Sequence, residues 1–166
     1  MDKTIIIPDV HGRSFWKSAP KDAKLIFLGD YLDPYLSEEE FQDYSSYSDP
    51  NLFEKLKENL LEIIQVKKER ANDVILLLGN HDLPYAGIGE FCCRYTTNLQ
   101  QRKEYKSIFN ENRDLFQLCY TLNTEKENYL FSHAGITEPW KNAHPELFRG
   151  VKEEELPQLI NNLFKE

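Results

Sequence analysis

Four clusters of residues that commonly bind metal ions occur along the chain. They are Asp9-Val10-His11-Gly12, Gly29-Asp30-Tyr31-Leu32-Asp33, Gly79-Asn80-His81-Asp82 and Ser132-His133-Ala134-Gly135. Carboxylate, amide and imidazole groups together suit Mn²⁺, Fe²⁺ or Zn²⁺ better than Ca²⁺. Two such ions about 3.5–4 Å apart can orient a hydroxide and clamp a phosphoryl group. The clusters therefore predict a metal-dependent hydrolase.

Each cluster follows a short apolar run that is typical of a buried β-strand. The runs are rich in Ile, Val and Leu and cover residues 4–8, 25–28, 74–78 and 129–131. In open α/β sheets, ligands bind beyond the carboxyl ends of the strands. We therefore expect one site, built from four loops at one edge of one sheet.

The remaining elements follow from periodicity and capping residues. An apolar stripe predicts an amphipathic helix over residues 51–70, capped by Asp49 or Asn51. A polar turn at residues 123–127 predicts an antiparallel strand pair, at a sheet edge or in a second sheet. Further helices are expected over 12–19, with Trp16 inward, and over 99–115 and 153–164.

Residues 34–50 interrupt this pattern with a polar, acidic and tyrosine-rich segment. We interpret it as an insertion loop directly after a candidate ligand loop. Long loops in such positions often carry function. A lid over the site and a simple solvated loop are equally compatible with its composition.

The bulk composition is that of one soluble globular domain over residues 1–166. The net charge of −8 disfavours binding of extended nucleic acid. The apolar runs are too short to span a membrane, and a strand starting at Thr4 leaves no room for a signal peptide. A cytoplasmic location is the expectation. The odd cysteine count, with Cys92 and Cys93 adjacent, predicts free thiols.

The four clusters, taken in order, resemble the calcineurin-like metallophosphoesterases. Ser-His-Ala-Gly is closest to the branch of protein Ser/Thr phosphatases and bacterial dinucleoside-tetraphosphatases. The resemblance covers about residues 4 to 136. It implies an α/β fold of the two-sheet αββα sandwich type.

The resemblance also implies roles for individual residues. His81 with Asp33 would be the catalytic dyad, with His81 protonating the leaving group after attack by a metal-bound hydroxide. Mn²⁺ is the first choice for the two divalent ions, with Fe²⁺ or Zn²⁺ as alternatives. The implied ligands are Asp9, His11 and Asp30 for the first metal, and Asp30, Asn80 and His133 for the second.

Two departures from the family pattern are visible. The closest branch has a phosphate-holding arginine where this chain has Pro34, and Arg94 is the substrate-binding candidate in its place. The family usually ends its site with a late Gly-His-x-His or Gly-His-Thr segment. Here only His144 follows His133, and it is expected on the surface. We therefore expect a domain that lacks the C-terminal strands of the family.

Three further expectations concern residues near these clusters. Asp82 is expected to orient its loop, Trp140 to anchor packing, and Tyr31 and Tyr35 to line the pocket or to pack elsewhere.

The predicted activity is hydrolysis of a small phosphate ester, a nucleotide or a phosphoprotein. The alternative is an impaired or vestigial enzyme that serves as a binding or scaffold module. A nuclease is disfavoured by the acidic charge.

Overall fold

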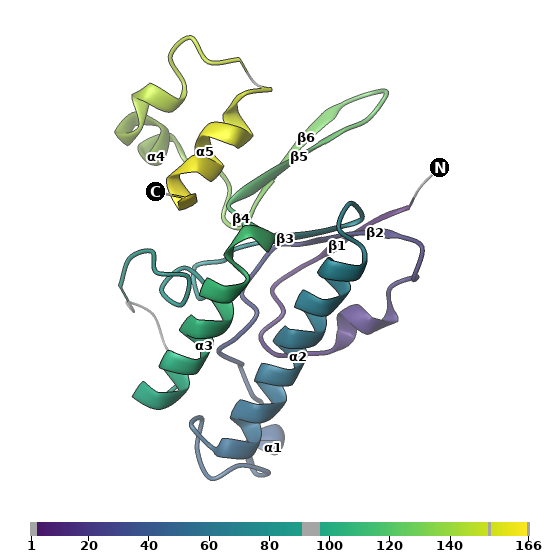
Figure 1. Ribbon diagram of the computed structural model, residues 1–166, viewed down its shortest axis with the longest axis vertical. Helices are drawn as coiled ribbons and strands as arrows, with labels where there is room; N and C mark the ends of the chain where they lie inside the picture. Colours follow the sequence, from purple (N-terminus) through teal and green to yellow (C-terminus); the bar gives the residue numbers. More distant parts are fainter. Residues whose placement is uncertain (1–2, 91–96, 153, 166) are drawn as a thin grey trace.

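A computed structural model describes residues 3–90, 97–152 and 154–165. Its main sheet has four parallel strands in the order β1-β2-β3-β4. The helices α2 and α3 lie on one side of this sheet, and a β-hairpin with α4 and α5 lies on the other (Figure 1). The sheet strands are β1 (Thr4–Ile7), β2 (Lys24–Phe27), β3 (Val74–Leu77) and β4 (Phe116–Gln117).

The helix α2 (Pro50–Glu69) connects β2 to β3 and covers the sheet. The carboxylate of Asp49 caps it by accepting a hydrogen bond from the backbone N–H of Asn51, at 2.8 Å. Its apolar stripe is buried, as the periodicity predicts. The buried apolar residues are Leu52, Phe53, Leu56, Leu60, Ile63 and Ile64.

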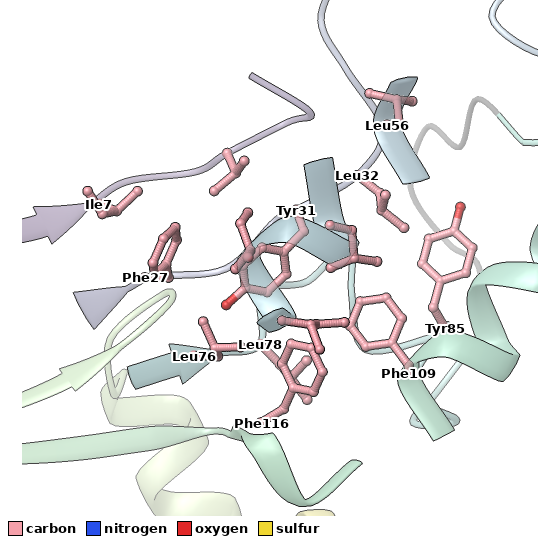
Figure 2. Close-up of a cluster of buried hydrophobic side chains, with 14 of the residues drawn as sticks. Ile7, Phe27, Tyr31, Leu32, Leu56, Leu76, Leu78, Tyr85, Phe109 and Phe116 are labelled. Carbon is pink, nitrogen blue, oxygen red and sulfur yellow. The ribbon is translucent and has the colours of Figure 1, made fainter. Parts of the chain in front are cut away.

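The main core lies between the sheet, α2 and α3 (Leu99–Glu111). Alternate sheet residues, such as Phe27 and Leu76, point into it. Figure 2 shows Tyr31 within this cluster, and its ring lies 5.8 Å from that of Phe116. The Tyr31 hydroxyl donates to the carbonyl of Leu77 at 2.9 Å. Tyr31 is therefore a core residue and does not line a pocket.

The fourth apolar run forms a second sheet and not an edge of the main one. The strands β5 (Cys119–Asn123) and β6 (Asn128–Ser132) pair antiparallel. One hairpin face, with Tyr120, Leu122 and Phe131, packs on the main sheet. Tyr129 and Leu130 are exposed, because a two-stranded hairpin buries only part of its surface. The expectation of one sheet edge is wrong for this strand.

Several boundaries differ from the sequence prediction. The segment 12–19 forms only a 3₁₀ turn, η1 (Phe15–Ser18), with Trp16 buried as expected. The helix predicted over 99–115 ends earlier, as α3, and continues in η2 (Arg113–Leu115). One residue, Leu118, separates β4 from β5, so the segment before the polar turn is divided between the two sheets.

The other helices are short. Within the insertion loop, α1 (Glu38–Phe41) is capped by the Ser37 hydroxyl. The C-terminal part contains α4 (Glu138–Ala143), η3 (Pro145–Leu147) and α5 (Leu156–Lys165). No helix in the described residues has the length and apolarity needed to cross a membrane. The two packed sheets with helices outside them confirm the predicted α/β fold class.

Cys119 is the cysteine that the structure places in detail. It is buried against α5 as a free thiol, as predicted. Burial raises its pKa to about 11, so the thiol stays protonated at neutral pH. Cys92 and Cys93 lie outside the described residues.

Candidate metal centre

The loops after β1, β2 and β3 meet at the carboxyl ends of these strands. The backbone N–H of His11 donates to the carbonyl of Asp30 at 2.7 Å, and that of Gly12 donates to Tyr31 at 2.8 Å. The backbone N–H of His81 donates to the Asp30 Oδ1 at 2.9 Å. Asp30 therefore lies between the first and third loops, as expected for a residue in the loop after β2, the strand between β1 and β3.

Two glycines allow the second and third loops to approach this closely. A Cβ atom at Gly29, which has φ of +111°, would lie 2.3 Å from the backbone nitrogen of Gly79. A Cβ at Gly79 would lie 2.1 Å from the Asp30 Oδ1. Since any larger residue would displace Asp30, both glycines serve the geometry of the site.

Asp82 holds the second and third loops together through its carboxylate. Its buried carboxylate accepts backbone N–H groups from Asp30 at 2.6 Å, Gly79 at 2.8 Å and Tyr31 at 3.0 Å. Burial and the nearby Asp30 carboxylate raise the pKa of Asp82, while the three N–H donors oppose this rise. The orienting role expected for Asp82 agrees with these contacts.

Asp9, His11 and Asp30 form a group that could hold a metal ion. One ligand atom from each lies within 4.8 Å of the others. The Nε2 of His11 is 4.0 Å from the Asp9 Oδ2 and 3.8 Å from the Asp30 Oδ2. The Asp30 side chain is almost fully buried, whereas the Asp9 side chain is half exposed at 51%. A cation at this point would offset carboxylate charge that is partly removed from water.

His133 approaches the same group from the second sheet. Its Nε2 is 3.6 Å from the Asp30 Oδ2 and 2.9 Å from the Asn80 Oδ1. Its Nδ1 is 3.7 Å from the Asp9 Oδ1. The five predicted ligands therefore lie together, although they come from two sheets.

The two histidines contact backbone carbonyls through the same ring nitrogen, Nδ1. The Nδ1 of His11 lies 2.9 Å from the carbonyl of Leu32, and the Nδ1 of His133 lies 3.0 Å from that of Leu28. A carbonyl can only accept, so each Nδ1 carries the hydrogen. In both residues the other nitrogen, Nε2, faces Asp30, and in His133 it also lies 2.9 Å from the Asn80 Oδ1. A cation would be needed to bring this nitrogen lone pair and the acceptor oxygens together, and a carbonyl at Nδ1 is common in metal-binding histidines.

His81 and Asp33 form a buried pair beside this cluster. The Nδ1 of His81 is 3.3 Å from the Asp33 Oδ2. The Tyr85 hydroxyl contacts the Asp33 Oδ1 at 3.4 Å and the Thr97 hydroxyl at 2.7 Å. The His81 and His11 rings are 5.5 Å apart. Asp33 is thus positioned to orient His81, whose ring lies next to a candidate ligand.

Three residues of the site have the left-handed backbone conformation that non-glycine residues rarely adopt. The φ values are 44° for His11, 51° for Asp30 and 56° for Asp33. Such conformations are unfavourable and concentrate at functional sites. Here each turns the chain sharply after a strand so that a polar side chain faces its neighbours.

A cleft of about 630 Å³ lies next to the ligand group. His11 and Pro34 line it, together with residues of α2 that include Lys55 and Leu56. Arg13 at its wall binds Glu40 of α1 through two contacts, at 2.8 and 3.2 Å. This pair is not among the predicted site residues, although the position of Arg13 two residues after His11 could have indicated that Arg13 lies near the site.

His144 and Trp140, also singled out in the sequence, make their contacts with residues outside the candidate ligand group. His144 ends α4 and is 3.3 Å from Glu146. Trp140 packs against the rings of His144 and Phe148, at 4.6 and 5.9 Å, as a packing anchor would. Arg94, the expected substrate-binding residue, lies outside the described residues.

A comparison with protein families gives a match over nearly the whole chain. The family model of the calcineurin-like phosphoesterases matches residues 4–166. A search of curated proteins and a search of solved structures returned no match. Because the family match includes all four candidate loops and nearly the whole chain, the chain belongs to the calcineurin-like phosphoesterase family.

Proposed function

We propose that the protein is a phosphoric ester hydrolase that holds two divalent cations, with Mn²⁺ as the first choice. The supporting observation is the convergence of His11, His133 and Asp30, in which both imidazole Nε2 atoms approach the same carboxylate oxygen within 4 Å. Asp9 and Asn80 complete the proposed ligand set. Family membership supports metal-dependent phosphoester hydrolysis in general.

The donor set fits such cations. It combines two imidazoles with carboxylate and amide oxygens, which suits Mn²⁺, Fe²⁺ and Zn²⁺. Asp9, His11 and Asp30 would hold one ion, and Asp30, Asn80 and His133 the other. When bound, divalent cations stabilise charge on phosphoryl oxygens and activate water for attack.

His81 is the proposed proton donor to the leaving oxygen. Asp33 contacts its Nδ1 and so directs the Nε2 of His81 away from Asp33. The His81 ring lies 5.5 Å from the ring of His11, a proposed metal ligand, which supports this role. General acids in such positions contribute about 10²–10⁴ in rate.

The proposed substrates are small phosphate esters, nucleotides or phosphoproteins. The net charge of −8 argues against extended nucleic acid as the substrate. The protein Ser/Thr phosphatase and dinucleoside-tetraphosphatase branch remains the proposed subgroup, on the strength of Ser132-His133-Ala134-Gly135.

The test is hydrolysis of p-nitrophenyl phosphate with and without Mn²⁺. We expect Mn²⁺-dependent turnover, a loss of at least about 100-fold with His81→Ala, and a comparable loss with Asp30→Asn. His144→Ala is the matched control, because His144 is remote from the site, and it should leave turnover unchanged.

Metal content and turnover together separate an enzyme from a vestigial scaffold. Mass spectrometry after Mn²⁺ incubation should find metal in the wild type and less in Asp30→Asn. A well-folded protein that neither retains metal nor releases p-nitrophenol would contradict the proposed function and favour the scaffold.

A further inference from the structure

Tyr35 stands beside both the candidate metal site and the proposed proton donor. Its ring is 4.7 Å from the His11 ring, at 87° to it, and 6.3 Å from the His81 ring. Tyr35 is 50% exposed, whereas His81 is buried at 4%. A half-exposed aromatic ring therefore borders the place where the leaving group would meet His81.

The backbone of Tyr35 is held in place by three neighbours. The guanidinium of Arg13 donates to the Tyr35 carbonyl at 2.8 Å. Arg13 is in turn fixed by Glu40, which also closes the cap of α1 by accepting the Ser37 N–H at 2.8 Å. Pro34 restricts the preceding backbone. Because these contacts fix the backbone of Tyr35 before any substrate binds, no backbone entropy is lost when the ring is used as a contact surface.

We infer that Tyr35 is a specificity-determining residue that contacts the leaving group and favours phosphate monoesters of phenols over those of aliphatic alcohols. The inference rests on the proposed function. In the reaction, the oxygen of water bonds to phosphorus and the bond from phosphorus to the aryl oxygen breaks. The electron pair stays on the aryl oxygen, which takes a proton from His81 and leaves as a phenol. One proton of the water stays on the hydrogen phosphate product, and the other is released to solvent, from which His81 is protonated again.

The position of the ring explains the preference for an aryl group. A phenyl ring is bonded directly to the oxygen that His81 protonates, so it must lie next to His81. The Tyr35 ring borders the same space, with its centroid 6.3 Å from that of His81, and aromatic rings that meet at centroid separations of about 4.5–7 Å attract one another. In a nucleotide the sugar separates the base from this oxygen, so the base would lie farther away. Aliphatic groups gain no ring contact.

The test compares kcat/KM for phenyl phosphate with that for ethyl phosphate in Mn²⁺. The intrinsic reactivity of the two esters cancels when their ratio is compared between variants. Tyr35→Leu should lower the phenyl-to-ethyl ratio about 3- to 10-fold, whereas Tyr35→Phe, which keeps the ring, should preserve it. Tyr129→Leu is the control, since Tyr129 is similarly exposed, at 45%, on the hairpin.

Binding provides a readout that does not depend on turnover. Calorimetry should show that Tyr35→Leu weakens the binding of benzylphosphonate by the same factor and leaves the affinity for methylphosphonate unchanged. The Mn²⁺ content of the protein should also stay the same. If the protein turns over substrate but Tyr35→Leu changes neither the phenyl-to-ethyl ratio nor the affinity for benzylphosphonate, the inference is overturned. If the wild type shows no Mn²⁺-dependent turnover, the proposed function is overturned instead. The phosphonate affinities would still decide the role of Tyr35.

Discussion

At the scale of single residues, several side chains of the candidate site are held by hydrogen bonds to residues outside the proposed ligand set. His11 and His133 each give a ring hydrogen to a backbone carbonyl, which fixes the tautomer that a metal requires. Asp33 is fixed by Tyr85 and adopts a left-handed backbone conformation at φ of 56°. These hydrogen bonds fix which ring nitrogen of each histidine carries the hydrogen, and they fix the orientation of Asp33.

The Asp33–His81 pair gives the first prediction at this scale. Asp33→Asn should lower kcat about 10- to 100-fold, which is less than the loss from removing His81. Asparagine tolerates the left-handed conformation, so the fold should survive while the carboxylate that contacts the His81 Nδ1 is lost. The measurement is kcat for p-nitrophenyl phosphate and phenyl phosphate.

The two esters make this test sharper. Phenolate is a poorer leaving group than p-nitrophenolate and depends more on a proton donor, so Asp33→Asn should slow phenyl phosphate more. An equal loss on both esters would speak against a role in proton transfer.

The sequence predicted which residues meet, but not how they are held. Strand ends at one sheet edge were enough to place Asp9, Asp30 and Asn80 near one another. The use of Asp82 as a buried acceptor for three backbone groups depends on loop geometry that no spacing reveals. The pairing of Arg13 with Glu40 joins positions separated by a strand and a turn, so the linear pattern could not show it.

At the scale of elements, the approach of the β2 and β3 loops depends on Gly29. Gly29→Ala should destabilise the protein by about 2–4 kcal/mol, because a positive φ and a backbone clash at 2.3 Å act together. Gly87→Ala is the control: it has φ of +85° and no described atom within 4 Å of the added Cβ.

In urea denaturation, Gly87→Ala should therefore lower the free energy of unfolding by only about 1 kcal/mol. Gly29→Ala should also lose Mn²⁺ binding, since Asp30 must move. Equal losses of stability in the two variants would show that the loops do not need this close approach.

The pairing of α1 with the first loop gives a pH-dependent prediction. The hydrogen bond from Arg13 lowers the pKa of Glu40 to about 2. Such a carboxylate stabilises the fold above its unfolded pKa of about 4.3, and the contribution disappears as pH falls toward 2. Glu40→Gln should lower the thermal midpoint at pH 6, and its difference from the wild type should shrink between pH 5 and pH 3.

Both groups are exposed, so the effect should also weaken in salt. Glu39→Gln, on the same helix, is the control. A midpoint difference that is constant across this pH range would show that the Arg13–Glu40 pair does not stabilise the loop.

Elements with a strong local signal were predicted from the sequence. The helix α2 has a cap, an apolar stripe and basic residues in its last turn, and it forms within one residue of the expected bounds at both ends. The strand β4 has two residues, too few for a pattern to emerge. The hairpin was predicted as a pair, but its place over the second face of the sheet depends on long-range packing with Ile26 and Ile75.

At the scale of the whole molecule, the site joins two sheets. Asp9 and Asp30 follow strands of the main sheet, whereas His133 follows β6 of the hairpin. The hairpin otherwise rests on the small cluster around Ile26, Ile75 and Leu77. A cation held by residues of both sheets would therefore stabilise their packing as well as take part in chemistry.

This arrangement predicts that Mn²⁺ stabilises the folded protein through His133. At a free Mn²⁺ concentration 100 times the Kd, binding adds about 2.7 kcal/mol, which corresponds to a rise of about 5–10 °C in the thermal midpoint for a chain of this length. His133→Ala should reduce that rise, and hydrogen exchange should show that Mn²⁺ no longer protects β5 and β6. His144→Ala should retain both effects, because His144 contacts Glu146 and not the site. Protection of the hairpin by Mn²⁺ in His133→Ala would mean that the cation does not couple the two sheets through this residue.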